Sequence, residues 1–127
     1  MTGAYSPFEP ARRPGESPDS RPAYRVLVHR RFANLWERLP TVVGLESAQQ
    51  FYDHVSRTPG ERPLVNSSVI LKGRAGEPKF VGASRTIHYE ISGAGRIDYQ
   101  YVDEFRDGAF GDPHPVVFIL TIDLSSH

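Results

Sequence analysis

The last third of the chain most restricts its fold, because two β-rich segments are separated there by a short glycine-containing turn. The segments are Ser84–Ile91 and Arg96–Val102, with residues 92–95 between them. This arrangement predicts a β-hairpin. A third segment, Val116–Leu124, is apolar on both of its alternating faces, which is typical of an interior strand. The core therefore has to form around a sheet.

Two amphipathic helices are predicted ahead of these strands, after a short strand at Tyr24–His29. The first helix covers residues 30–39 and should end at Pro40. Its apolar residues follow the helical repeat of i, i+3, i+4 and i+7: Phe32, Leu35, Trp36 and Leu39. The second helix is predicted from about Leu45 to Arg57, and a further strand from about Ser68.

This order of elements predicts an α+β domain, with two N-terminal helices packed on one face of a twisted antiparallel sheet. Residues that share the helical stripes or the last strand should fill the core. They are Phe32, Leu35, Trp36, Phe51, Tyr52, Val55, Phe118 and Leu120.

Residues 1–22 differ from the rest, because they contain five prolines and show no hydrophobic period. They are predicted to form a disordered arm, although Phe8 could dock on the domain, and residues 23–127 form a single domain. The chain has no cysteine, which excludes a disulfide framework and a zinc–thiolate site. No apolar run is long enough for a membrane span or a signal peptide, so a cytoplasmic protein is expected.

The charges are segregated, although the formal net charge is zero. Residues 24–84 hold nine Arg or Lys against five Asp or Glu, whereas residues 85–127 hold three against seven. A local basic face is therefore compatible with the composition, and so is an ordinary mixed surface.

Three segments give the region from about Tyr24 to His127 a resemblance to a known family. They are Arg57-Thr58-Pro59-Gly60-Glu61-Arg62-Pro63-Leu64, Arg85-Thr86-Ile87-His88-Tyr89-Glu90-Ile91, and a final hydrophobic strand that closes on Ser125-Ser126-His127. In these segments and in its element order the chain resembles the RelE/ParE superfamily of bacterial toxins, and within it the ribosome-dependent messenger-RNA interferases of the YoeB kind.

The resemblance implies a toxin-like endoribonuclease of a toxin–antitoxin system, or a degenerate relative of one. Its partners would be an antitoxin protein and messenger RNA on the ribosome, with no cofactor. By position, Glu61 matches the general base, Arg85 the phosphate-binding arginine and His127 the general acid. A planar guanidinium suits the middle role because it can hold two phosphate oxygens at once.

Other residues of the hairpin could add to this chemistry. His88 shares a strand face with Glu90 and could carry a proton if Glu90 or Asp98 pairs with it, or the pair could be structural. Residues that could contact RNA through charge or base stacking are Lys72, Arg74, Arg96, Tyr89 and Tyr99. A metal site built from His88, Asp112, His114 and His127 matches no known ligand spacing.

A second class of function stays open, namely a non-enzymatic module that binds a protein through the sheet or through the acidic loop at residues 103–114. The charge of the exposed sheet face distinguishes the two classes. Basic residues gathered there favour RNA, and acidic residues favour a protein partner.

Overall fold

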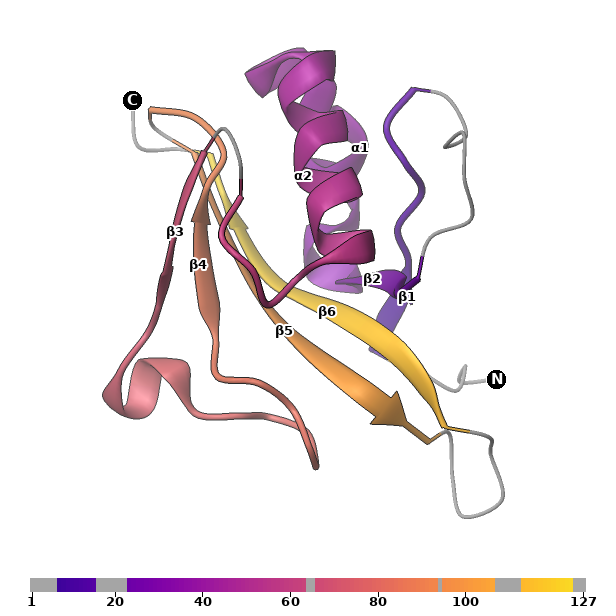
Figure 1. Ribbon diagram of the computed structural model, residues 1–127. Coiled ribbons are helices and arrows are strands. Elements are labelled where there is room, and N and C mark those ends of the chain that lie inside the picture. The colour runs from indigo at the N-terminus through magenta and orange to yellow at the C-terminus, as the bar shows by residue number, and fades with distance from the viewer. Residues whose placement is uncertain (1–6, 16–22, 64–65, 94, 107–112, 125–127) are drawn as a thin grey trace.

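The computed structural model describes residues 7–15, 23–63, 66–93, 95–106 and 113–124. They form a six-stranded sheet with two α-helices beside it (Figure 1). The helices are α1 (Ala33–Val43) and α2 (Leu45–Arg57), with short 3₁₀ helices η1 (Arg30–Phe32) and η2 (Gly73–Gly76). The strands are β1 (Phe8–Pro10), β2 (Arg25–His29), β3 (Ser67–Ile70), β4 (Ile87–Glu90), β5 (Arg96–Phe105) and β6 (His114–Asp123). The α+β class predicted from the sequence is confirmed.

The sheet is mixed, which corrects the prediction of a wholly antiparallel one. The strand order is β1-β2-β6-β5-β4-β3, and β2 runs parallel to β6 while every other neighbouring pair is antiparallel. The doubly apolar β6 takes the interior place predicted for it, between β2 and β5. β6 runs antiparallel to β5. β2 lies along the other edge of β6 and runs parallel to it, which is possible because the chain after β2 continues into helices and not into a tight hairpin.

The second helix has the bounds predicted from the sequence, but the first continues beyond Pro40 to Val43. Pro40 removes one N–H donor from the helix, but the last turn still closes because the Gly44 N–H donates to the Pro40 carbonyl at 2.9 Å. The break between the helices comes at Gly44, whose φ of 95° suits glycine. Neither helix is long and apolar enough to cross a membrane.

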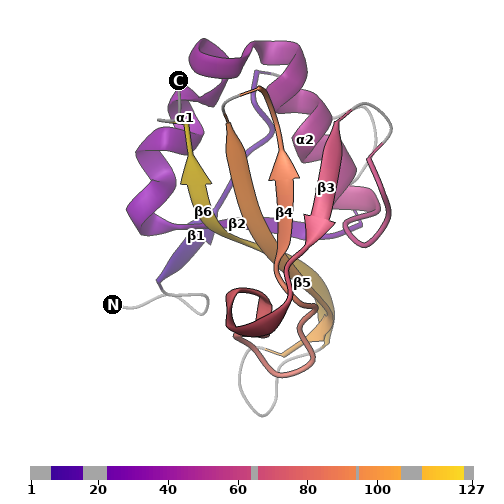
Figure 2. The ribbon, with the colours of Figure 1, turned by 90° about the vertical axis from the view of Figure 1, so that its left-hand side faces the viewer.

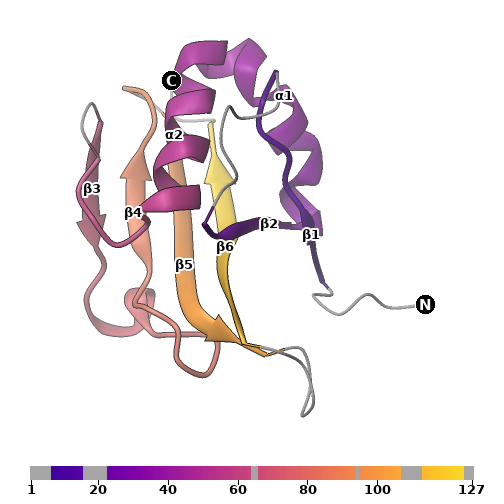
Figure 3. The same ribbon diagram turned by 45° about the vertical axis from the view of Figure 1, so that its right-hand side comes forward.

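Two hydrophobic clusters pack on opposite faces of the sheet. The larger joins the helices to the sheet, and in it Phe51 of α2 contacts the rings of Tyr89 and Tyr99. Figure 3 shows both helices in front of the sheet on this side. The smaller lies on the other face, where Phe80 stacks on Phe118 with ring centroids 4.0 Å apart.

Most of the predicted core residues are buried: Trp36, Phe51, Tyr52, Val55 and Phe118. Three are only partly buried: Phe32, Leu35 and Leu120. Phe118 and Leu120 belong to the smaller cluster, away from the helices, because alternate residues of β6 point to opposite faces of the sheet.

The described part of the N-terminal arm is ordered, which corrects the prediction that residues 1–22 lack regular structure. Phe8–Pro10 pairs with β2, and the Phe8 ring packs edge-on against Phe118. Arg13 forms a bidentate ion pair with Asp53 of α2, at 2.9 and 3.0 Å. A short segment without periodicity can thus be held by a sheet edge and by specific side chains. Residues 1–6 and 16–22 lie outside the described part.

Candidate functional site

The sheet face opposite the helices, which faces the viewer in Figure 2, carries polar side chains on β4, β5 and β6. Two neighbouring rows of paired residues cross β4, β5 and β6 on this face. One row consists of His88, Asp98 and Thr121, and the next consists of Glu90, Arg96 and Asp123. Residues directly opposite each other share a face. We call these six residues the polar face, and they are Glu90, His88, Arg96, Asp98, Thr121 and Asp123.

His88 and Asp98 form the closest polar contact of this face. The His88 Nδ1 lies 2.5 Å from the Asp98 Oδ1, and the two side chains keep 32% and 25% of their surface exposed. A carboxylate at Nδ1 favours the tautomer with its proton there and leaves Nε2 as an acceptor. The Nε2 atom has no hydrogen-bond partner among the described residues. The imidazole is therefore oriented for proton transfer at an accessible nitrogen.

Arg96 places a cation in the row beside this pair. Its Nη1 donates to the carbonyls of Ser92 and Gly95 in the hairpin turn, at 3.2 and 3.0 Å. Within the described residues, its Nε and Nη2 have no partner. Glu90 lies opposite on β4 and is half-buried. The polar face thus combines an oriented histidine, an arginine with free donors and a second carboxylate.

A loop at residues 72–84 borders the polar face, and the buried Gln100 holds it there. The Gln100 Nε2 donates to the Glu77 carbonyl at 2.8 Å and to the Thr86 Oγ1 at 2.9 Å, while its Oε1 accepts from the Lys79 N–H at 2.9 Å. Figure 2 shows η2 and the rest of this loop in front of the lower end of the sheet. Gln100 was not predicted as a site residue, although a polar residue at an interior-facing position of a strand was a usable signal.

This loop carries two of the predicted RNA-binding residues, Lys72 and Arg74, and both are exposed. They stand on the segment that borders the polar face, so the structure places them on the same side of the sheet as His88 and Arg96.

Arg85 has a structural role in the same loop. Its Nε donates to the Leu71 carbonyl at 2.9 Å and its Nη2 to the Gly73 carbonyl at 2.6 Å. A guanidinium used in this way ties the end of β3 to η2. Its predicted function as the phosphate-binding residue is not supported by this geometry, since two of its nitrogen atoms are already bound to the backbone.

Replacing Arg85 with alanine is expected to lower the free energy of unfolding by about 1–3 kcal/mol, because two backbone carbonyls lose a charged donor. Urea denaturation would measure the loss. The matched control is Arg74→Ala, where an exposed arginine of the same loop is removed and the change should stay within about 0.5 kcal/mol. Equal midpoints for the two variants would contradict a structural role for Arg85.

Tyr89 and Tyr99 belong to the core, which corrects their prediction as an RNA-stacking surface. They are 1% and 0% exposed, and they point toward the helices. The Tyr89 hydroxyl accepts from the Asn66 amide at 3.0 Å, and the Tyr99 hydroxyl donates to the Pro59 carbonyl at 2.6 Å. A ring buried under α2 has no free face for a base, so these tyrosines cannot stack on RNA.

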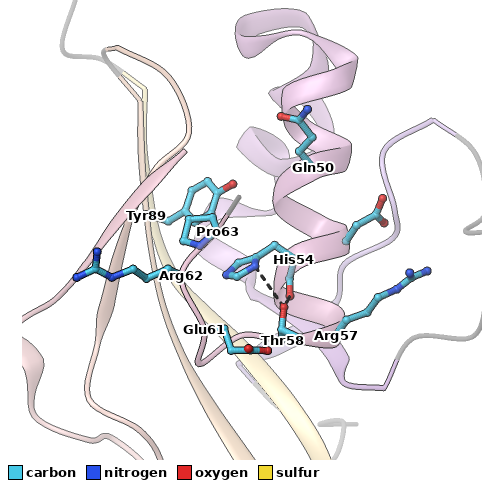
Figure 4. Close-up of a pocket in the computed structure, with 9 residues that line it drawn as sticks. Gln50, His54, Arg57, Thr58, Glu61, Arg62, Pro63 and Tyr89 are labelled. Atoms are coloured by element: carbon cyan, nitrogen blue, oxygen red, sulfur yellow. Dashed lines mark hydrogen bonds between the residues drawn. The ribbon is translucent and has the colours of Figure 1, made fainter. Parts of the chain in front are cut away.

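Glu61 lies on the helix side of the sheet, in a cavity beside the end of α2 (Figure 4). We call this the α2 cavity. It is lined by Gln50, Asp53, His54, Arg57, Thr58, Glu61, Arg62, Pro63 and Tyr89. Because the sheet separates Glu61 from His88, the structure does not bring these two candidate catalytic residues together.

Three other predicted positions lie outside the described residues, in whole or in part. They are His127, Asp112 and half of the acidic loop at 103–114, namely residues 107–112. In the described half, Asp103 accepts a hydrogen bond from the Tyr24 hydroxyl at 2.5 Å. Burial and this carboxylate raise the pKa of Tyr24 to about 12. Among the described residues, no group of three or more His, Asp or Glu side chains could hold a metal ion.

Comparisons with known proteins do not extend this description. No family model matches the chain, and neither a curated protein nor a solved structure matches it. The likeness to the RelE/ParE toxins rests on the three sequence segments and on the order of the elements, so it stays a prediction.

Proposed function

We propose that this chain is a toxin-like endoribonuclease that cleaves single-stranded RNA on its polar face, using side chains for proton transfer. The observation that carries the proposal is the His88–Asp98 pair, because an imidazole held at Nδ1 by a carboxylate is a common arrangement for a general base. The RelE-like resemblance supports messenger RNA as the substrate and an antitoxin as the regulating partner.

The polar face offers a group for each step of cleavage through the ribose 2′-hydroxyl. The His88 Nε2 removes the proton from the 2′-oxygen, which attacks the adjacent phosphorus and forms a bond to it. The bond from phosphorus to the 5′-oxygen of the next nucleotide then breaks, and this oxygen takes a proton back from the Nε2 of the His88 imidazolium, which restores the neutral ring. The products are a 2′,3′-cyclic phosphate and a free 5′-hydroxyl, and each proton has a donor and an acceptor.

Arg96 has the electrostatic role in this scheme. Negative charge grows on the phosphoryl oxygens during the attack, and a fixed cation beside them lowers the barrier. Arg96 suits this role because the hairpin turn binds its Nη1 while Nε and Nη2 stay free of partners in the described structure. It replaces Arg85 in this role. Lys72 and Arg74 would hold the strand at flanking phosphates.

The purified chain should cut a fluorescently labelled single-stranded RNA in the presence of EDTA and leave 2′,3′-cyclic phosphate ends. The same sequence made of DNA should stay intact, since it lacks the attacking 2′-hydroxyl. Expression in bacteria, with new messenger-RNA ends mapped on and off ribosomes, tests the toxin class. Intact RNA in both settings would overturn the proposal.

A binding module without catalysis is the second candidate, and one observation favours it. The polar face carries three carboxylates, Glu90, Asp98 and Asp123, against a single arginine, so its charge is not basic. A basic protein segment could bind such a face. Salt-sensitive capture of a basic peptide without any RNA cleavage would support this reading over the first.

A further inference from the structure

The strand β3 forms an open edge of the sheet and lacks the charge, proline or bulge that commonly protects such an edge. Figure 3 shows it at the outer margin of the sheet, with β4 as its neighbour. Its sequence is Ser67-Ser68-Val69-Ile70, and its pairing with β4 has no register shift. An edge strand of this kind readily pairs with another strand. The inference below concerns this edge and does not rest on the proposed function.

The opposite edge of the sheet, β1, is protected in a way that β3 is not. The Ala11 N–H donates to the Val26 carbonyl of β2 at 2.9 Å. Backbone groups in an antiparallel pair face the neighbouring strand at every second residue, so those of Phe8 and Pro10 point outward. Pro10 has no N–H to donate. Within β1, the Phe8 N–H is therefore the sole outward donor.

On β3 the outward backbone groups belong to Ser68 and Ile70. The Leu71 N–H donates to the Thr86 carbonyl at 2.9 Å, in the same register that pairs β3 with β4. By the same alternation, Ser68 and Ile70 direct both their N–H and their C=O groups away from β4. Within the described residues, these groups have no hydrogen-bond partner. A free donor and acceptor on each residue form a template for one more strand.

The side chains of this edge are apolar on both faces of the sheet. Val69 is 55% exposed and pairs with His88 on the side of the polar face. Ile70 is 58% exposed and pairs with Ile87, whose side chain belongs to the cluster under the helices. On this helix side, residues 60–62 and β3 line a groove of about 310 Å³. A strand that pairs with β3 would remove these apolar side chains from water.

We propose that two copies of this chain form a dimer by antiparallel pairing of β3 with β3 about a two-fold axis. Pairing Ser68 with Ile70 of the second copy keeps the side chains on matching faces and satisfies the outward backbone groups of both copies. Val69 then lies on the axis against Val69 of the second copy, in a pair without hydrogen bonds, where side chains come closest. The edge is thus complementary to itself, as a two-fold interface requires.

The helix side of the edge also fits a second copy. Ile70 of the second copy lies opposite Ser68, beside the groove, and its aliphatic side chain can fill it. Glu61 and Arg62 are exposed at the groove and carry opposite charges. Two such rims can form Glu61–Arg62 ion pairs, and neither has an excess of one sign that would repel the other. Because the axis is perpendicular to the sheet, both polar faces lie on the same side of the dimer.

Sedimentation-velocity ultracentrifugation should show a monomer–dimer equilibrium with a Kd on the order of 10 μM, since a four-residue edge makes a small interface. Val69→Lys brings two like charges together on the axis and should raise the Kd at least about tenfold. Ser68→Pro removes an outward N–H, which an edge strand tolerates, and should also weaken the dimer. The matched control is Val81→Lys, since Val81 is 98% exposed in the loop at 72–84. This variant should dimerise as the wild type does.

A single introduced cysteine tests the register, because the chain has none of its own. Val69→Cys should form a disulfide-linked dimer under mild oxidation, since the closest pair across the axis is within reach of a disulfide. Val81→Cys should stay monomeric, and equal cross-linking of the two variants would overturn the inference. So would an unchanged Kd for Val69→Lys, or a wild type that is monomeric up to about 1 mM. The last result would leave the edge to an extended segment of another protein.

Discussion

His88→Ala is expected to lower the rate of RNA cleavage by about 10²- to 10⁴-fold, the usual contribution of a positioned general acid or base. The imidazole is the group of the polar face with an unoccupied acceptor nitrogen and a fixed orientation, and both properties are lost together with the ring. Single-turnover cleavage of a labelled RNA would measure the change, because it reports the chemical step apart from product release.

Asp98→Asn tests whether the orientation of His88 matters. The amide can still contact Nδ1, but it no longer stabilises the protonated imidazole or selects the tautomer, so the rate should also fall. The matched control is His29→Asn, which removes a histidine from a different region and keeps an acceptor for the Arg31 N–H. A His88→Ala variant that cleaves as fast as the His29→Asn variant would exclude His88 as the base.

The hydrophobic pattern was enough to predict most of the elements of this fold. The period of α2 and the alternation of the hairpin were read correctly because local sequence determines them. The parallel pairing of β2 with β6 was missed, since the relative direction of two strands far apart in sequence depends on the route of the connecting chain. β1 was missed because three residues of ordinary composition leave no periodic signal, and their pairing with β2 holds them in place.

The candidate site was harder to predict, since it depends on which side chains face each other. The alternation of β4 placed His88 with Glu90 on one face, and the hairpin register brought Asp98 opposite His88. That partner was one of two considered, and the structure decides between them. Arg85 could not be assigned in the same way, because its hydrogen bonds go to carbonyls of a loop whose path the sequence does not reveal.

Phe51→Ala is expected to lower the free energy of unfolding by about 3–5 kcal/mol, as large-to-small changes of aromatic core residues do. Phe51 is fully buried at the centre of the larger cluster, where its ring meets Trp36 of α1 and Tyr89 and Tyr99 of the sheet. Such a loss is a large part of the roughly 5–15 kcal/mol that stabilises a typical domain. Thermal and urea denaturation would both show it.

The matched controls for Phe51→Ala distinguish a cavity from a general loss of helix packing. Phe51→Leu keeps most of the volume and should cost much less, because the remaining void is smaller. Val42→Ala changes an α1 residue that is 44% exposed, and its effect should stay near 0.5 kcal/mol or below. If Phe51→Ala unfolds at the same urea concentration as Val42→Ala, then α2 does not pack on the sheet as described. The helix side would then lack the core that holds Tyr89 and Tyr99 in place, and with them the strands that present His88 and Asp98.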